Sequence, residues 1–335
     1  MEKFSWYDAQ SVEEALKEVD ATVSSAINDS PNKASVIKAG GVDLLDLMKE
    51  GLVSPKRLIN IRNINGLDQI TFDKKTGLRI GSNVTLGEME ENETIKTSYA
   101  AVHQAVAHCA TPQLRNMASL GGNLAQRTRC WYFRSLDHEC FRKGGNMCFA
   151  KNGENEYHSI MKNGTCSSVH ASSISTALLA FDASIEIAGP DGSRKELKLE
   201  EFFVLPGDDP LKENVLKANE LITAVIIPPV NKNTKSTYLK QGGRESYDWA
   251  LADVAVVAEV SGSKAKGVTI ALGAAAPIPL KSKKAAEAIE GKSIEEASAK
   301  ASGEVAVDGA TPLAKNGYKV PLFKTLVKRA LLEIA

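Results

Sequence analysis

The sequence predicts an α+β fold divided into two or three domains. The chain has 335 residues, which is more than a single domain usually contains. Short apolar strands alternate with amphipathic helices through its N-terminal part, as expected of sheets covered by helices. At Pro228-Pro229 and the polar run Asn231–Ser236 this pattern stops, and longer strands followed by alanine-rich helices replace it. We therefore expect a linker there and a separate C-terminal domain.

The helix starts are marked by side chains that can cap them. Capping boxes at Ser11–Glu14 and Thr85–Glu88 predict the first turns of two helices. Between them a Gly-Gly pair follows a buried strand, and we expect Asp43 to cap the next helix and Gly51 to end it. The other elements predicted in this part are strands at Ser35–Ala39, Arg57–Ile61 and Leu78–Ile80, and an alanine-rich helix over 98–109 that Pro112 interrupts.

The C-terminal part ends in a helix, Leu322–Ile334, whose apolar residues recur at helical spacing. We expect it to pack on the C-terminal sheet; the alternative is a helix that binds a partner. The other elements predicted here are a helix at Ile174–Phe181 and strands at Ser184–Ala188, 237–240, 250–260 and 268–272.

Charge and composition exclude several classes of partner. Lys+Arg and Asp+Glu number 41 each, so no net charge favours nucleic acid or an anionic membrane. The N-terminus lacks the apolar core of a secretion signal, and no apolar run has the length of a membrane span. We expect a cytoplasmic protein whose thiols stay reduced.

Two glycine turns indicate a phosphate-bearing cofactor. Gly40-Gly41 lies between a strand and a helix start, and Gly121-Gly122 follows the run Ala110–Leu120. Without a Cβ, backbone N–H groups at such turns can approach a pyrophosphate. Two unrelated structural turns would also need glycine, and neither turn has the G-x-G-x-x-G pattern of a nicotinamide-binding fold. Together, however, the turns could hold one extended dinucleotide from two sides.

Four cysteines within 37 residues, Cys130, Cys140, Cys148 and Cys166, lie in a loop of little periodicity at about 124–172. Their spacing, C-x9-C-x7-C-x17-C, lacks the C-x2-C pair that zinc knuckles usually present. Wide spacing fits a loop wrapped around a larger object, such as a [4Fe–4S] cube. Structural zinc and free or disulfide-linked thiols are the alternatives.

Three stretches occur in this order along the chain: Ala39–Asp43, Arg115–Asn123 and Arg244–Ala250. Together they resemble the FAD-binding subunit of the molybdenum hydroxylases, which are the xanthine dehydrogenase and carbon monoxide dehydrogenase family. The resemblance covers essentially the whole chain. It implies a two-part FAD-binding domain of the vanillyl-alcohol-oxidase type, with subdomains at 1–56 and 57–225. It further implies a C-terminal α/β domain of the CO dehydrogenase flavoprotein type at 226–335.

By this resemblance both glycine turns would hold the pyrophosphate and ribityl chain of FAD, and Lys240 would lie near the isoalloxazine ring. Read from the sequence alone, Lys240 is equally well an ordinary lysine at a strand end. The residues that we expect at the cofactor are Lys38, Ala39, Gly40, Gly41, Val42, Asp43, Ala110, Thr111, Arg115, Asn116, Ser119, Gly121, Gly122, Asn123, Ser173 and Lys240.

In one segment the chain departs from the family pattern. Many members have a Pro-Ser-Asp run whose aspartate lies beside the flavin, and here the run is Ala171-Ser172-Ser173. Ser173 can hydrogen-bond but carries no charge. We therefore expect the flavin potential, or the contact with a nucleotide oxidant such as NAD, to differ from that of the family.

A subset of the family, resembling the flavoprotein subunits of 4-hydroxybenzoyl-CoA reductase and of periplasmic-type aldehyde oxidoreductase, carries an inserted loop with a [4Fe–4S] cluster. The string Arg129–Arg134 together with Lys143–Gly145 and Cys148 is similar to that insert. The resemblance thus implies an FAD-dependent oxidoreductase subunit that passes electrons through FAD and a [4Fe–4S] cluster.

The implied partners are a large molybdenum-cofactor subunit, a small [2Fe–2S] subunit and an external carrier such as NAD or a ferredoxin. A free-standing flavin oxidoreductase of the vanillyl-alcohol-oxidase type is one alternative. A zinc-stabilised binding module is another. The sequence names neither the substrate nor the direction of electron flow.

Overall fold

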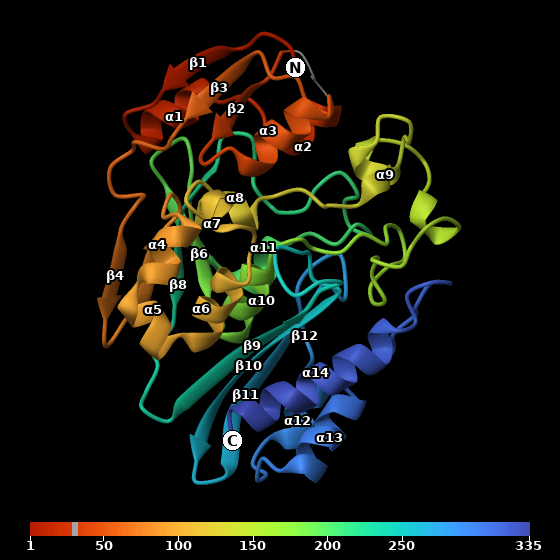
Figure 1. Cartoon of the computed structure of the whole chain (residues 1–335). Helices are drawn as coiled ribbons and strands as arrows, with labels where there is room; N and C mark the ends of the chain where they lie inside the picture. Colours follow the sequence, from red (N-terminus) through yellow and green to blue (C-terminus); the bar gives the residue numbers. More distant parts are fainter. Residues whose placement is uncertain (29–32) are drawn as a thin grey trace.

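The computed structural model describes residues 1–28 and 33–335, and it arranges them around three β-sheets (Figure 1). The sheets follow one another along the long direction of the molecule. The N-terminal sheet lies at the top of Figure 1, the largest sheet in the middle and the C-terminal sheet below it. Helices pack on each sheet, and the cysteine loop projects at one side.

The N-terminal sheet is parallel, in the order β1-β3-β2. Of the two capping boxes, the first is half formed: the Ser11 hydroxyl accepts from the Glu14 backbone, but the Glu14 carboxylate bonds Gln10 and Tyr7 instead. The elements are β1 (Ser5–Asp8), α1 (Val12–Glu18), α2 (Val23–Asn28), β2 (Ser35–Lys38), α3 (Val42–Lys49) and β3 (Arg57–Asn60).

The middle sheet is antiparallel, in the order β4-β5-β8-β6-β7. The second capping box, Thr85 with Glu88, is complete and starts α4. The elements are β4 (Ile70–Asp73), β5 (Gly77–Gly81), α4 (Leu86–Glu91), α5 (Glu93–Ser98), α6 (Ala100–Ala107), α7 (Pro112–Arg115), α8 (Leu120–Leu124), α10 (Ser173–Ala180), β6 (Ser184–Ala188), β7 (Arg194–Lys198), α11 (Leu199–Phe202) and β8 (Leu221–Ile227).

Two helix predictions need correction. The expected helix over 98–109 is interrupted at Tyr99, whose backbone leaves the helical region (φ −127°, ψ 53°), so that α5 ends and α6 begins there. Pro112 occupies the first turn of α7, with Thr111 as its cap, because proline fits at a helix start. Asp43 does not cap α3: Gly41 is the N-cap residue, and the Asp43 carboxylate lies in the first turn.

The C-terminal sheet is antiparallel, in the order β12-β11-β10-β9, and is covered on both faces. Helices α6 and α10 contact one face, and α12, α13 and α14 lie on the other, as predicted for the last helix. The elements are β9 (Thr234–Gln241), β10 (Ala252–Ser261), β11 (Lys264–Gly273), β12 (Leu280–Lys281), α12 (Lys283–Ile289), α13 (Glu296–Glu304) and α14 (Lys319–Glu333).

The region expected to be a linker is shorter than predicted. Strand β8 continues to Ile227, so the boundary placed at residue 226 falls inside it. Strand β9 begins at Thr234, which makes the end of the polar run part of the C-terminal sheet.

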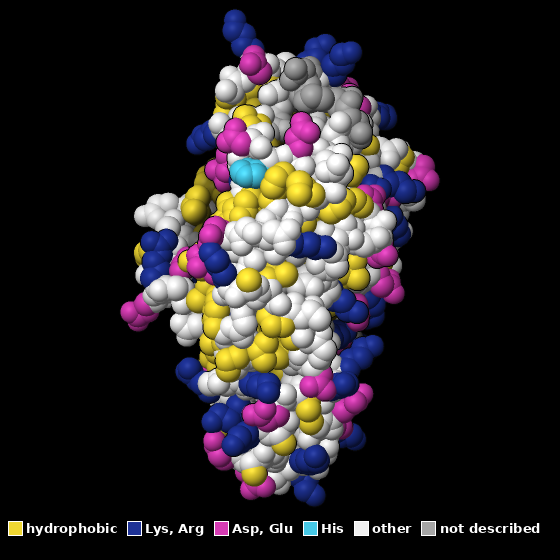
Figure 2. Space-filling model, turned by 90° about the vertical axis from the view of Figure 1, so that its right-hand side faces the viewer, with side chains coloured by type: hydrophobic (Ala, Val, Ile, Leu, Met, Phe, Trp, Pro, Cys, Tyr) yellow, Lys and Arg dark blue, Asp and Glu magenta, His cyan; other side chains and the backbone are white. Residues whose placement is uncertain are grey.

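The cysteine loop lies beside the sheets and contains little regular structure, namely α9 (Trp131–Arg134) and two 3-10 turns, Phe141–Lys143 and Phe149–Lys151. Figure 2 shows this side of the molecule. Hydrophobic side chains gather over the upper and middle parts of this face, whereas charged side chains crowd its lower end. Within the described residues, no helix is long and apolar enough to cross a membrane.

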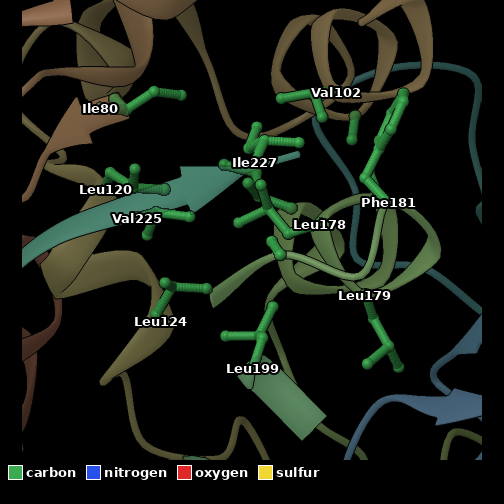
Figure 3. Close-up of a cluster of buried hydrophobic side chains, with 14 of the residues drawn as sticks. Ile80, Val102, Leu120, Leu124, Leu178, Leu179, Phe181, Leu199, Val225 and Ile227 are labelled. Carbon is green, nitrogen blue, oxygen red and sulfur yellow. The ribbon is translucent and has the colours of Figure 1, made fainter. Parts of the chain in front are cut away.

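The principal core joins the middle sheet to its helices (Figure 3). Side chains from β5, β8, α6, α8 and α10 converge there, among them Ile80, Val102, Leu120, Leu178 and Val225, all fully buried. This core continues into the C-terminal sheet through Tyr238, Ala255 and Ala271. The two parts of the chain therefore share apolar contacts.

Candidate cofactor sites

The first glycine turn joins β2 to α3. Gly41 has φ +81°, a left-handed conformation that favours glycine. A Cβ on Gly40 would lie 1.9 Å from the carbonyl oxygen of Met117, in the segment that leads to the second turn. The two turns, some eighty residues apart in sequence, therefore lie against each other.

The second turn starts α8. The Ser119 hydroxyl accepts a hydrogen bond from the Gly122 backbone at 3.3 Å, which caps the helix. A Cβ on Gly121 would lie 2.9 Å from the Cβ of Ser82. Glycine thus lets α8 approach the end of β5 closely.

A large cavity opens between the two turns and holds about 1290 Å³ of space free of protein atoms, its open mouth included. Because residues of both glycine turns line it, the cavity suits an extended ligand. Ten of the predicted residues line it: Lys38, Ala39, Gly40, Gly41, Val42, Asp43, Ser119, Gly121, Gly122 and Asn123.

The cavity wall is suited to an anion. Lys38, Arg127, Arg129, Lys212 and Lys217 line it, against the acidic residues Asp43 and Glu220. The N-terminus of α3 adds its partial positive charge. Burial lowers the pKa of Lys38, because the uncharged amine is easier to desolvate.

Apart from Arg127 Nε, which forms an ion pair with Glu213, three polar atoms on this wall are buried without a hydrogen-bond partner among the described residues: Ser82 Oγ, Asn83 Oδ1 and Arg129 Nε. Such atoms are costly unless a ligand or water satisfies them. The residues present therefore fit a polar, phosphate-bearing ligand such as FAD.

The other six predicted residues lie outside the lining of this cavity. Arg115 is fully engaged elsewhere, since its guanidinium pairs with Glu90 at 2.7 Å and donates to the carbonyl oxygens of Cys109 and Ala110. Lys240 donates to the backbone carbonyls of His108 and Asp248 at 2.6 and 2.7 Å. The remaining four are Ala110, Thr111, Asn116 and Ser173.

Several cavity residues were missed by sequence reasoning. Ser82 and Asn83 follow strand β5. Arg127 and Arg129 come shortly before Cys130, and Lys212 lies on a long loop before β8. Except for Arg129, which begins the string that resembles the cluster insert, none belongs to a local motif. Only the polar pair Ser82-Asn83, directly after a buried strand, could have indicated cavity residues from the sequence.

All four predicted cysteines line one small apolar pocket, together with Phe133, Arg142 and Phe149. With the solvent at its mouth included, it holds about 280 Å³ of space free of protein atoms. Cys109 lies apart, packed against the principal core.

Backbone N–H groups surround the sulfur atoms in this cysteine pocket. The N–H groups of Tyr132 and Phe133 face Cys130, and those of Arg142 and Lys143 face Cys140. The N–H groups of Ala150 and Ser167 face Cys148, and that of Ser168 lies 3.5 Å from Cys166 Sγ. Backbone donors of this kind stabilise thiolates.

Burial and mutual contact set the protonation of the thiols. Burial raises the pKa of Cys130 to about 12, and that of Cys140 is raised for the same reason. A shared hydrogen bond raises the pKa of Cys148 and lowers that of Cys166. His158, which the sequence did not single out, places Nε2 at 3.2 Å from Cys130 Sγ, and burial lowers its pKa to about 4.

Across the described ranges, no three His, Cys, Asp or Glu side chains approach closely enough to hold one metal ion. The described residues thus contain no group with the geometry of a tetrahedral zinc site. A cube whose four irons each take one thiolate needs its ligands further apart.

The fold and the large cavity define a flavoprotein subunit, and comparison with known proteins identifies its family. Residues 2–230 match the model of the FAD binding domain in molybdopterin dehydrogenase, and residues 237–334 match the CO dehydrogenase flavoprotein C-terminal domain. The chain belongs to the FAD-binding medium subunits of the xanthine dehydrogenase and carbon monoxide dehydrogenase family, and is an FAD-dependent oxidoreductase subunit.

Among its relatives, the aldehyde oxidoreductase FAD-binding subunit PaoB of Escherichia coli K12 is 34% identical over 88% of this chain and 90% of its own length. The carbon monoxide dehydrogenase medium chain of Hydrogenophaga pseudoflava is 24% identical over 88% and 86%.

Solved structures share the fold. Carbon monoxide dehydrogenase from Hydrogenophaga pseudoflava has a TM-score of 0.74 at 22% identity and covers 99% of this chain and 96% of its own. Quinoline 2-oxidoreductase from Pseudomonas putida 86 has a TM-score of 0.72 at 22% identity over 99% and 97%. The predicted α+β fold class is confirmed.

Proposed function

We propose that this chain is the electron-transfer subunit of a molybdenum hydroxylase-type complex, with FAD in the large cavity and a [4Fe–4S] cluster in the cysteine pocket. The observation that carries the proposal is the convergence of Cys130, Cys140, Cys148 and Cys166 on one pocket. Their wide spacing in sequence gives no local reason for them to meet. Bound there, FAD and the cluster would supply two-electron and one-electron transfer.

The glycine turns would hold the FAD pyrophosphate. Gly40 and Gly41 present backbone without a Cβ at the N-terminus of α3, and Gly121 and Gly122 do so at α8. Lys38 supplies positive charge beside them. Neither Ser172 nor Ser173 lines the cavity, but the Ser172 hydroxyl donates to the side chain of Asn123, which does. Ser173 and Lys240 remain proposals for the flavin end of the ligand.

The cysteine loop would hold the cluster and shield it. Phe133 is 1% exposed and Phe149 packs beside it, so the pocket is largely apolar. Apolar surroundings and N–H donors to sulfur are the factors by which a protein adjusts the potential of an iron–sulfur cluster. The wide spacing of the four cysteines along the chain, without a C-x2-C pair, favours a cluster over a single zinc ion.

The names of the relatives support a multi-subunit assembly. They include a "medium chain" and a "medium subunit", and we propose a large molybdenum-cofactor subunit and a small [2Fe–2S] subunit as partners. On the cysteine loop Trp131, Leu136, Met147 and Tyr157 are exposed, and such side chains are enriched at interfaces. An NAD or ferredoxin-like carrier would complete the path, although uncharged Ser173 weakens the argument for NAD.

Iron and acid-labile sulfide per flavin, measured on protein purified anaerobically with its copurifying subunits, test the proposal. We expect four irons per flavin from this chain. Changing Cys148 or Cys140 to serine should remove four irons per flavin and the part of the iron–sulfur absorbance that they contribute, and should spare FAD, because a hydroxyl is a poor substitute for a thiolate.

Cys109→Ser is the matched control, since Cys109 packs on the principal core and should leave the absorbance unchanged. Stoichiometric zinc without iron would refute the cluster. A monomer that oxidises a small substrate unaided would instead support a free-standing flavin oxidoreductase.

A further inference from the structure

The wall between the large cavity and the cysteine pocket is made of three buried charged side chains. Arg127, Arg142 and Glu213 have 2%, 1% and 4% of their side chains exposed. Arg127 Nε lies 2.6 Å from one Glu213 carboxylate oxygen, and an Arg142 terminal nitrogen lies 3.5 Å from the other. Charges this deeply buried are costly unless they are paired.

On one side the wall borders the large cavity. Arg127 lines this cavity. Its backbone N–H donates to the Asp43 carboxylate at 2.8 Å, and its guanidinium donates to Ser24 Oγ at 2.8 Å. The same guanidinium lies 4.8 Å from the ring centroid of Phe133, which lines the cysteine pocket. Arg127 therefore contacts both sites.

On the other side Arg142 lines the cysteine pocket. It donates to the carbonyl oxygen of Lys212 at 2.7 Å, and Lys212 lines the large cavity. Cys166 lines the same pocket, so the buried guanidinium and this sulfur border one small space. The Nε of Arg142 is buried and has no hydrogen-bond partner in the described part of the chain.

The charges of the wall do not balance. Two guanidinium groups face one carboxylate, and the shorter ion pair belongs to Arg127. Arg142 thus retains positive charge that faces the sulfur atoms. A buried cation of this kind needs an anion nearby, and a thiolate-ligated cluster of net negative charge would provide it.

We propose that Arg142 raises the reduction potential of the iron–sulfur cluster by holding a fixed positive charge against Cys166, and that Glu213 moderates this effect. The inference rests on the cluster of the proposed function. On reduction the cluster takes one electron, from the flavin or from a partner's iron–sulfur centre, and its net charge becomes more negative by one. A nearby fixed cation stabilises the reduced form more than the oxidised form.

The test is the midpoint potential of the cluster in the full chain, prepared anaerobically with its cofactors and titrated with dithionite. The cluster is followed by its visible absorbance and by electron paramagnetic resonance of the reduced form. Arg142→Met should lower the ratio of reduced to oxidised cluster at least tenfold at a given potential, which is 59 mV for one electron. Arg142→Lys keeps the charge and should restore most of the potential.

Two further variants separate this effect from general ones. Lys143→Met removes one positive charge from the residue next to Arg142. Because the Lys143 side chain is partly exposed and donates to the Ser135 carbonyl, this change should shift the ratio of reduced to oxidised cluster less than threefold. Glu213→Gln removes the moderating carboxylate and should shift the potential upward.

The outcomes are distinguishable. Iron-loaded variants with the wild-type potential would overturn the role of Arg142 and leave the cluster standing. Wild-type protein without iron would overturn the cluster and this inference with it. If Arg142→Met fails to retain iron, Glu213→Gln decides: a raised potential supports the inference, and an unchanged one overturns it.

Discussion

At the scale of single residues, close approach explains the glycines better than flexibility does. Gly40 has an ordinary backbone conformation, yet its missing Cβ allows Met117 of the second turn to lie against it. Sequence reasoning found both turns because each is a local motif. It could not find the buried pair of Arg127 and Glu213, because 86 residues separate them and nothing near either predicts the other.

Replacing Gly40 with alanine should abolish or strongly weaken FAD binding, by tenfold or more. The new Cβ would stand 1.9 Å from a backbone oxygen, so the two turns must separate. Flavin per protein after purification measures the effect. Gly207→Ala is the control, since a Cβ there meets nothing within 4 Å. Full flavin occupancy in the Gly40 variant would show that the turns do not jointly hold the cofactor.

At the scale of elements, what could be predicted depended on burial. Strand β6 was predicted with its observed bounds, and α10 within one residue, because both are buried and apolar. Of the missed strands, β1, β4 and β7 are exposed along most of their length, so no alternation of apolar residues marks them. Burial alone does not decide, because β8 was missed although nearly all of its residues are buried. Asp43 followed the rule for a cap, but Arg129 and Arg134 pair with its carboxylate at 2.9 and 2.7 Å.

The contact of α10 with the C-terminal sheet contains a buried acid. Asp253 on β10 is 2% exposed, and its carboxylate and the hydroxyl of Thr176 of α10 occupy the space that Gly273 of β11 leaves free. Burial raises its pKa to about 7, although Lys240 and Lys319 oppose this rise. Unfolded, an aspartate titrates near pH 4.

The stability should therefore depend on pH in a definite direction. Between about pH 4 and pH 7 the folded state binds the extra proton, so stability falls as pH rises through this range. Asp253→Asn removes the penalty, and we expect a gain on the order of 2–4 kcal/mol at pH 8 but little change at pH 4.5. Thermal unfolding at the two pH values measures it. Asp208→Asn, at an exposed position, is the control and should leave the unfolding temperature unchanged at both pH values. Destabilisation by Asp253→Asn at pH 8 would contradict the argument.

At the scale of the whole molecule, the C-terminal sheet is not an independent appendage. One of its faces belongs to the principal core through Tyr238, Ala255 and Ala271, and the other packs on α14. Domain boundaries read from composition mark where the chain changes character. They do not show that the parts share a core, because that sharing arises from contacts distant in sequence.

Flavin release and unfolding of the C-terminal sheet should consequently occur in one transition. Leu331 of α14 is fully buried against the far face of that sheet. Leu331→Ala should lower the free energy of unfolding by about 2–5 kcal/mol. Although Leu331 lies in a different core from the cavity, the temperature of flavin release should fall together with the temperature at which circular dichroism is lost. Leu136→Ala, the same substitution at a leucine that is 65% exposed, should leave both temperatures unchanged. We expect one transition because a shared core transmits the loss of packing from one sheet to the next. A Leu331 variant that loses circular dichroism at a lower temperature, yet releases flavin at the wild-type temperature, would show that the two parts unfold separately.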